Sequence, residues 1–187
     1  AFHAILLLAL LFSLGVLATL ILSVLAGGLP VFAERGLSFL TSPTSANPDK
    51  AGVVQGIIGS ILLTIIVAVV AIPLGIMTAI YLEEYADKTR WWNRLIEVNI
   101  QNLAAVPSII YGILGLGFIV RGPLDLGFVL AAGSLTLALL VLPMVIIAAR
   151  EAIRAVPDSI RQGSLALGAT KWQTIRAQVL PASIPGI

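Results

Sequence analysis

The sequence predicts an all-α protein, a polytopic bundle of transmembrane helices, and two observations support this. Of the 187 residues 59% are hydrophobic and only 11% are charged, whereas a soluble domain of average composition carries about 25% charged residues. The charged residues also leave four stretches free of Lys, Arg, Asp and Glu, each long enough for the ~20 apolar residues that cross a bilayer as a helix. This composition excludes a soluble enzyme, a nucleic-acid binder and a disordered chain.

The charge-free stretches place four expected spans at about residues 3–30, 53–82, 97–120 and 126–149. The first is too long for the ~7–15 apolar residues of a signal peptide. The chain begins without Met and ends at Ile187, inside an apolar segment. We therefore expect residues 1–187 to be a single transmembrane domain that is truncated at its C-terminus, with further spans beyond residue 187.

Basic residues are unevenly distributed over the segments between these spans. Segments 83–97 and 150–187 together hold eight Lys and Arg, whereas segments 34–50 and 121–125 hold three. Alternate loops lie on the same side of a membrane, and cytoplasmic loops carry the excess of Lys and Arg. The charges therefore predict that segments 83–97 and 150–187, together with the N-terminus, lie in the cytoplasm.

Segment 150–180 carries the signals of two short amphipathic helices instead of a span. Pro157 and Asp158 are typical of a helix start, and Gly168 can adopt the positive φ that ends a helix. Between them a small, mildly apolar face repeats at helical spacing, formed by Ile160, Gly163, Ser164 and Leu167. These residues predict a first helix that ends in a glycine turn.

The second helix of this segment is expected to start at Thr170, which forms a capping box with Gln173. Apolar residues share one side of it, namely Trp172, Ile175 and Val179. Pro181 is expected to end it, because proline removes a backbone donor.

Polar and small residues share one face of the third expected span, in the order Gln101, Ala105, Ser108, Gly112 and Gly115. Two interpretations stay open. Small residues let helices approach closely while polar ones hydrogen-bond between helices, or the face lines a solute path. Gln101, Asn102 and Ser108 are the candidates for such a path.

Prolines interrupt three of the spans, at Pro73, Pro107 and Pro143. Each removes one backbone donor and can kink its helix. Kinked helices suit a bundle that moves or lines a cavity, although static bundles contain them too.

Charged residues at the cytoplasmic ends of the spans allow more than one reading. Glu83 and Glu84 are expected to end the second span at the membrane interface. Arg150 and Glu151 either form an interfacial charge pair that fixes the depth of the fourth span, or mark the inner end of an anion pathway, where a guanidinium group suits phosphate oxygens.

No catalytic constellation is present in the sequence. It contains no GxxxxGK[ST] motif for nucleotide phosphates, no cysteine, and one histidine, His3. We therefore expect no catalytic residue, no metal site and no cofactor bound by this chain.

A cytoplasmic pair of short helices behind a four-span bundle resembles the coupling segment of ABC importer permeases, whose pattern is E-A-A-x3-G-x9-I-x-L-P. Gly168 and Leu180-Pro181 stand at the expected spacing. The sequence departs from the pattern at four positions, with Gln162, Gly163 and Ser164 in place of Glu-Ala-Ala and Gln178 in place of the apolar residue.

Longer stretches resemble the PstA-type permease subunit of bacterial phosphate importers more specifically. They are Ala79–Tyr85, Asn99–Leu116, Arg154–Arg161 and Gly168–Ile175. The resemblance implies a MetI-like bundle of six spans in the bacterial cytoplasmic membrane, surrounded by lipid. It also implies a PstC-type permease partner, PstB-type ATPase subunits that hold ATP and Mg²⁺, and a PstS-type phosphate-binding protein outside the membrane.

The resemblance implies that residues 150–180, called the coupling segment below, dock on the ATPase subunits. The residues expected to transmit the motion are Asp158, Arg161, Gln162, Gly163, Ser164, Leu167, Gly168, Ala169, Thr170 and Trp172. The expected function is phosphate translocation driven by ATP hydrolysis in a separate subunit, so this chain is not expected to be an enzyme. The alternatives are an ABC permease for another solute, and a secondary transporter or channel that needs no ATPase.

Overall fold

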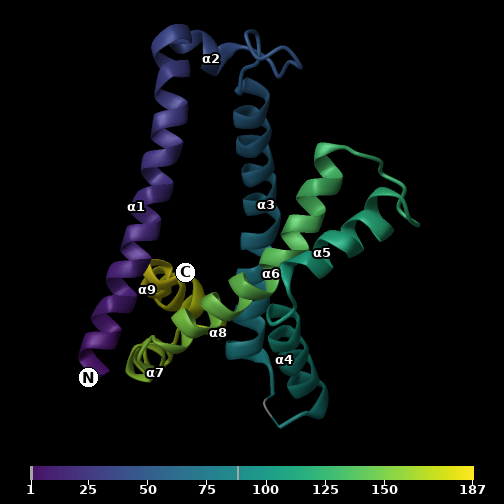
Figure 1. The fold of residues 1–187 in the computed structure, drawn as a ribbon. Coiled ribbons are helices and arrows are strands. Elements are labelled where there is room, and N and C mark those ends of the chain that lie inside the picture. Colours follow the sequence, from purple (N-terminus) through teal and green to yellow (C-terminus); the bar gives the residue numbers. More distant parts are fainter. Residues whose placement is uncertain (1, 88) are drawn as a thin grey trace. The chain divides into compact units, whose positions relative to one another are not determined.

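The computed structural model of the chain describes residues 2–87 and 89–187. These residues form helices, turns and loops, with no strand in the described ranges, so the predicted all-α class is confirmed (Figure 1). The chain divides into two compact units, residues 1–60 and 61–187. The sequence-based expectation of one domain stays a prediction, and each unit is described by itself.

The first unit consists of α1 (Phe2–Arg35), α2 (Leu37–Thr41), an irregular loop and the start of α3 (Val54–Ile80). No residue of α1 is buried, although the helix is apolar on all sides. A helix of this kind is typical of a membrane span. Arg35 at its end donates hydrogen bonds to the carbonyl oxygens of Pro48 and Ala51, which fixes the loop before α3.

The second unit contains the rest of α3 and all later elements. In chain order these are η1 (Tyr81–Tyr85), α4 (Trp91–Ala104), α5 (Ser108–Leu114), η2 (Gly115–Val120), α6 (Leu130–Arg154), α7 (Asp158–Ala166), α8 (Lys171–Thr174), η3 (Ile175–Val179), α9 (Leu180–Ser183) and η4 (Ile184–Gly186). η1, η2 and η3 are wide π-helical turns, and η4 is a 3₁₀ turn.

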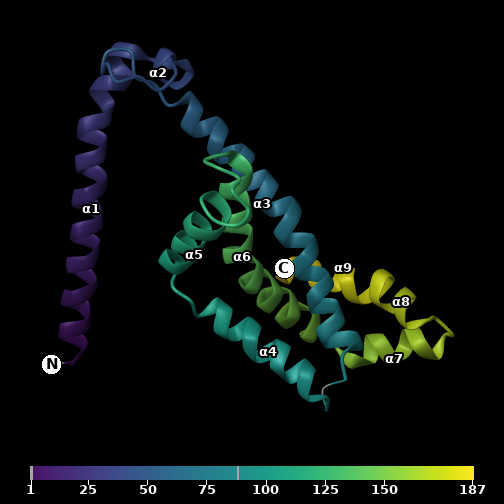
Figure 2. The same cartoon turned by 90° about the vertical axis from the view of Figure 1, so that its right-hand side faces the viewer.

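Helix α6 is the centre of this unit and packs against α4, α5, η1 and the C-terminal turns (Figures 1 and 2). Its close contact with α3 depends on Gly75, because a Cβ atom there would lie 2.6 Å from Cγ1 of Val145. The main core cluster joins the ends of α3 and α6 to the last helical stretch, through Ala79, Ile80, Ala149, Ile153, Val156, Ile175 and Val179. The coupling segment is therefore attached to the spans by apolar packing.

Among the described residues, three helical stretches are long and apolar enough to cross a membrane, namely Phe2–Arg35, Val54–Tyr85 and Leu130–Arg154. The third expected span differs, because Trp91–Ala104 and Ser108–Val120 meet at an angle of 98°. The bent pair gives four spans if it is counted as one. The segment 97–120 is thus a broken helix, interrupted near Pro107, one of the three prolines that were expected to interrupt a span.

The break occurs at Pro107, which stands at the N-cap of α5 with φ −56°. Proline disfavours the helical conformation of the residue before it, here Val106, and donates no backbone hydrogen bond. Pro73 and Pro143 lie inside the continuous helices α3 and α6. Of the three expected interruptions, only the one at Pro107 breaks a helix.

The bend also separates the residues that the sequence placed on one helix face. Gln101 lies on α4, whereas Ser108 and Gly115 follow the break. The single continuous face is therefore wrong. Gly115 packs against α6, because a Cβ atom there would lie 2.4 Å from Cγ2 of Thr136. This contact agrees with the helix-packing interpretation.

Candidate functional site

The coupling segment forms two helical arms joined by a glycine turn, as predicted. Helix α7 ends at Ala166, and Gly168 adopts φ +87°, a conformation that glycine reaches without the steric cost of a Cβ atom. Thr170 then caps the second arm. Its Oγ1 accepts a hydrogen bond from the Gln173 amide at 3.3 Å, and Gln173 Oε1 accepts one from the Thr170 amide at 2.8 Å.

The second arm continues past the predicted end at Pro181, so that expectation is wrong. It runs through α8, η3 and α9 to Ser183. The wide turn η3 precedes Pro181, and widening relieves the clash of a proline ring with the carbonyl group one turn earlier. Ile175 and Val179 are each 1% exposed and anchor this arm in the core.

The two arms also contact each other and expose an apolar tip. Thr174 Oγ1 donates a hydrogen bond to Ser164 Oγ at 3.0 Å. Leu167 is 89% exposed, and Leu165 and Trp172 are about half exposed. Exposed apolar groups gathered at one tip are typical of a protein contact surface.

Arg161 joins three elements at the base of the first arm. Its guanidinium donates to the carbonyl oxygens of Ile153 at 2.7 Å and Val156 at 2.5 Å, at the end of α6. It also pairs with Asp158 Oδ1 at 3.1 Å and with Glu84 Oε1 at 3.0 Å. One half-buried side chain thus fixes the turn between α6 and α7 and ties both to the end of the second span.

Lys171 makes a second connection from the other arm to the same place. Its ammonium group donates a hydrogen bond to the carbonyl oxygen of Glu84 and lies 5.0 Å from the centre of the Tyr85 ring. Both arms are therefore held by Glu84, one through its side chain and one through its backbone.

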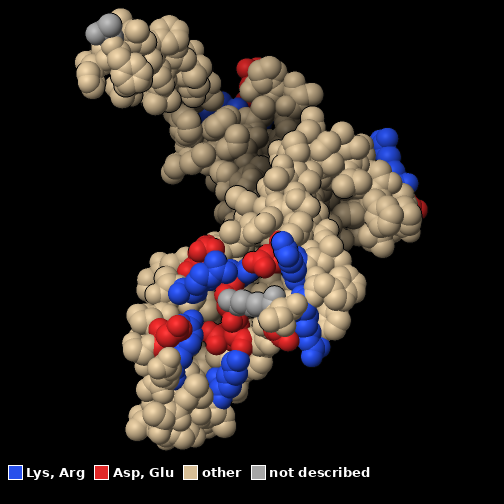
Figure 3. Space-filling view, turned by 90° about the horizontal axis from the view of Figure 1, so that it is seen from below, with Lys and Arg blue, Asp and Glu red and all other residues tan. Residues whose placement is uncertain are grey.

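A neighbouring network connects α6 to η1 and α4. Arg150, 7% exposed, donates to Glu83 Oε1 at 2.8 Å and to Glu97 Oε1 at 2.5 Å. Arg154 pairs with Glu83 Oε1 at 2.7 Å and with Glu151 at 3.4 Å. Figure 3 shows basic and acidic side chains gathered on one face of the second unit, next to a surface that is largely uncharged.

Of the two readings of Arg150 and Glu151, a direct pair between them is not formed in the structure. Adjacent residues point to different faces of a helix, so Glu151 pairs with Arg154 one turn on, while Arg150 faces Glu83 and Glu97. Two carboxylates already offset the charge of Arg150. The role of Arg150 in an anion pathway stays a prediction.

The turn before α4 is held by Asp87. Its Oδ1 accepts hydrogen bonds from the Thr89 hydroxyl at 2.6 Å and the Thr89 amide at 3.0 Å, and its Oδ2 accepts one from Arg90 at 3.3 Å. The Thr89 hydroxyl is the main reason why the pKa of the Asp87 carboxyl lies below its usual range. The Asp87 carbonyl oxygen accepts a hydrogen bond from Asn93 Nδ2 at 2.8 Å.

The structure places the other predicted site residues mostly at the surface. On the coupling segment, the exposed ones are Asp158, Gln162, Gly163, Gly168 and Thr170, while Ala169 is half-buried. Gln101, Asn102, Ser108 and Glu151 are exposed as well. Gln101, Asn102 and Ser108 do not converge with Arg150 on a common cavity among those of the described chain.

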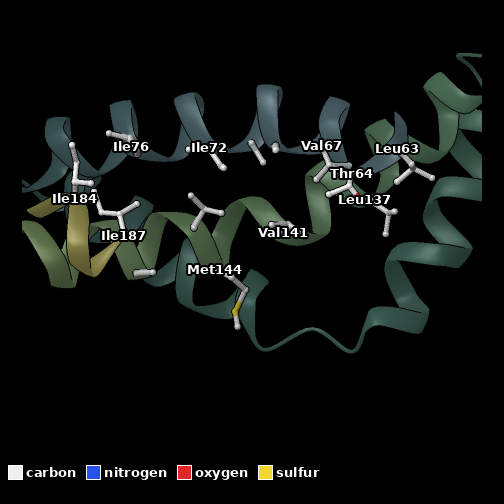
Figure 4. Close-up of a pocket in the computed structure, with 14 residues that line it drawn as sticks. Leu63, Thr64, Val67, Ile72, Ile76, Leu137, Val141, Met144, Ile184 and Ile187 are labelled. Carbon is white, nitrogen blue, oxygen red and sulfur yellow. The ribbon is translucent and has the colours of Figure 1, made fainter. Parts of the chain in front are cut away.

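An apolar groove of about 740 Å³ lies between α3 and α6, with Ile184 and Ile187 at one end (Figure 4). Thr64 is its one polar lining residue. Such a groove lacks the donors that an anion needs. Within residues 2–87 and 89–187 no group of three His, Cys, Asp or Glu side chains could hold a metal ion.

Sequence reasoning missed Glu83, Glu84 and Glu97 as site residues. It treated the first two as markers of a span end, and Glu97 as part of a charged loop. The sequence did contain a signal for these residues, namely the several carboxylates in segment 83–97. This segment was expected on the same side of the membrane as the basic coupling segment. Pairing across 67 residues, as between Glu83 and Arg150, is a product of the tertiary fold.

Comparisons with known proteins agree with this architecture. Residues 71–187 match the family described as binding-protein-dependent transport system inner membrane component. YqgH of Bacillus subtilis, a probable ABC transporter permease protein, is 39% identical over 170 residues, covering 84% of the chain and 54% of the relative.

Two further relatives carry phosphate transport in their names. The phosphate transport system permease protein PstA 1 of Mycobacterium tuberculosis is 40% identical over 138 residues, covering 73% of the chain and 44% of the relative. The phosphate transport system permease protein PstC of Xylella fastidiosa is 32% identical over 197 residues, covering 91% of the chain and 60% of the relative.

The chain thus spans about half the length of the curated relatives that it matches. No solved structure matches it. The predicted resemblance to PstA-type permeases is confirmed by its relatives, and the chain belongs to the family of binding-protein-dependent transport system inner membrane components.

Proposed function

We propose that this chain is the PstA-type membrane subunit of an ABC importer that moves inorganic phosphate into the cell. ATP would be hydrolysed by PstB-type subunits with their own Mg²⁺, and phosphate would be delivered by a PstS-type protein outside. A PstC-type subunit would complete the membrane part in the bacterial inner membrane, with the N-terminus in the cytoplasm. The names of the relatives support the solute and the partners.

The geometry of the coupling segment carries this proposal. A permease without an ATPase site must receive movement from a partner, and a lever transmits movement only if it is rigid at its base and exposed at its tip. The base is fixed by Arg161 and Lys171 to Glu84, while Leu167 at the tip is 89% exposed. Closure of the ATPase dimer would push this tip, and the spans would rock between inward- and outward-facing states.

The test is phosphate uptake by the full-length protein, assembled with its permease, ATPase and binding-protein partners in proteoliposomes. We expect uptake that needs ATP inside and binding protein outside, and ATP hydrolysis that phosphate-loaded binding protein stimulates. Uptake without hydrolysis would support the secondary transporter or channel, and ATPase stimulation by a different solute would support a different ABC permease. Either result contradicts the phosphate importer.

A further inference from the structure

A small polar cavity lies where η1, α4 and α6 meet, apart from the apolar groove. Its volume is about 80 Å³, which exceeds the roughly 30 Å³ that one water molecule occupies in the liquid. Its lining consists of Leu82, Ala86, Asn93, Arg94, Glu97, Arg150 and Arg154. Three guanidinium groups, one carboxylate and one amide thus surround a cavity large enough for a small polar ligand.

Asn93 supplies an acceptor without a protein partner. The residue is 6% exposed, and its Nδ2 group donates to the Asp87 carbonyl oxygen at 2.8 Å. This hydrogen bond sets the orientation of the amide, because only the nitrogen can donate. Asn93 Oδ1 then has no hydrogen-bond partner among the described residues. A buried acceptor of this kind favours a ligand that brings its own donor.

The arginines supply donors that their ion pairs do not use. Each guanidinium has five N–H donors. Arg150 uses Nε and Nη2, and Arg154 uses Nη1 and Nη2, in their pairs with carboxylates. The Arg94 guanidinium makes no hydrogen bond or ion pair within the described part of the chain, although the Arg94 backbone N–H donates to the Arg90 carbonyl oxygen. The cavity therefore offers several cationic donors together with one neutral acceptor.

We propose that this cavity binds a protonated tetrahedral oxyanion, namely inorganic phosphate, at the cytoplasmic ends of the spans. Phosphate near neutral pH keeps at least one P–OH group, which donates to Asn93 Oδ1 while its other oxygens accept from the arginines. Sulfate is fully ionised and has no such donor. The Glu97 carboxylate beside Arg150 further disfavours an oxyanion without a proton.

The inference rests on the proposed function for the identity of the oxyanion, and it adds a site and a selectivity. Discrimination by an unpaired buried acceptor is strong, because a ligand that lacks the donor leaves the acceptor unsatisfied. The cavity would thus select phosphate over sulfate on the inner side of the membrane, independently of the binding protein.

The test is equilibrium binding of radiolabelled inorganic phosphate to the full-length permease assembled with its permease partner and ATPase. The binding protein is omitted, and the complex is held in phosphatidylcholine nanodiscs, whose phosphodiester groups carry no P–OH. We expect Asn93→Leu to weaken phosphate binding about tenfold, as expected for one lost hydrogen bond to a charged ligand, and to reduce the preference over competing sulfate. Arg94→Gln should weaken the binding of both anions.

Two matched variants serve as controls. Asn99→Leu changes an exposed asparagine on the same helix, and Arg121→Gln changes an exposed arginine in the loop before α6. Both should leave phosphate binding unchanged. If Asn93→Leu fails to assemble, Asn93→Ser, which keeps a polar side chain but shortens it, takes its place.

Several outcomes would overturn the inference. The first is an absence of phosphate binding when the binding protein is omitted, as expected if the cavity holds only water. The second is an unchanged preference for phosphate over sulfate in both Asn93 variants. If ATP-driven phosphate uptake persists in such a case, the inference fails and the proposed function stands. An absence of ATP-driven phosphate uptake by the wild-type assembly would instead refute the proposed function.

Discussion

At the scale of single residues, Arg161 and Gly168 set the shape of the coupling segment in different ways. Arg161 fixes the base through four acceptors on three elements. Gly168 allows the turn at the other end of α7 through its backbone conformation alone, since a Cβ atom there would meet nothing within 4 Å. One position depends on side-chain geometry and the other on the absence of a side chain.

Replacing Arg161 by Lys is expected to loosen the base and to reduce phosphate transport per ATP hydrolysed. An ammonium group keeps the charge but cannot reach Glu84, Asp158 and two carbonyl groups at once, as the planar fork does. Each lost charged hydrogen bond costs about 1.5–3 kcal/mol. Arg176→Lys is the control, because Arg176 is exposed and makes no ion pair within the described ranges. Equal coupling ratios in both variants would contradict the role of Arg161.

Replacing Gly168 by Ala is expected to destabilise the segment by about 1–2 kcal/mol, the cost of forcing a residue with a Cβ atom into the left-handed region. Gly163→Ala is the matched control. It lies within α7 with nothing near its Cβ position, so it should stabilise the helix by about 0.5–1 kcal/mol. Hydrogen exchange of the α7 and α8 amides measures both changes. Equal protection in the two variants would be incompatible with a glycine-dependent turn.

At the scale of elements, the break between α4 and α5 divides the third charge-free segment into two helices. A straight helix would place its polar residues on one face, whereas the chain bends by 98° between α4 and α5, and both helices pack against α6. Residues of the first half of α4 line the small polar cavity together with Leu82 and Ala86, in and just after η1.

Replacing Pro107 by Ala is expected to straighten this break, because the helical conformation becomes accessible to Val106 and a backbone donor is restored. The 187 residues contain no cysteine, so spin labels can be attached to cysteines at exposed Leu95 and Ile113. In a straight helix their backbones would be about 27 Å apart, at 1.5 Å per residue. Pulsed electron resonance should show the distance increasing towards this value.

The control for this measurement is Pro143→Ala, which lies in a continuous helix and should leave the distance between the labels unchanged. A distance that stays the same in the Pro107 variant would show that tertiary packing, and not the proline, sets the bend.

At the scale of the whole molecule, the assembly proposed above predicts that the exposed tip and the spans can be separated by mutation. Leu167→Asp places a charge on an apolar contact without touching the core. We expect membrane insertion to persist while copurification of the ATPase subunit and phosphate-stimulated hydrolysis are lost, since desolvating an unpaired charge is costly. Leu124→Asp, at an exposed loop leucine outside the coupling segment, should retain both. A Leu167 variant with normal stimulated hydrolysis would rule out docking through this tip.

The sequence by itself determined the helical class, the positions of most long apolar helices, the glycine turn at Gly168 and the capping box at Thr170. These follow from local properties, namely the length of apolar stretches, backbone preference and hydrogen bonds between neighbours in the chain. The same local rules failed at Pro181 and treated Pro73, Pro107 and Pro143 alike, because the cost of a proline depends on the turns around it.

Only the tertiary structure decided which charges meet. Arg150 and Glu151 are neighbours in sequence but not partners, whereas Glu83 and Glu84 lie about seventy residues from the arginines that they bind. A helix directs adjacent side chains to different faces, and an ion pair forms where folded elements bring opposite charges together. For this reason the polar cavity at Asn93 and the attachment of the coupling segment to Glu84 emerged only from the folded chain.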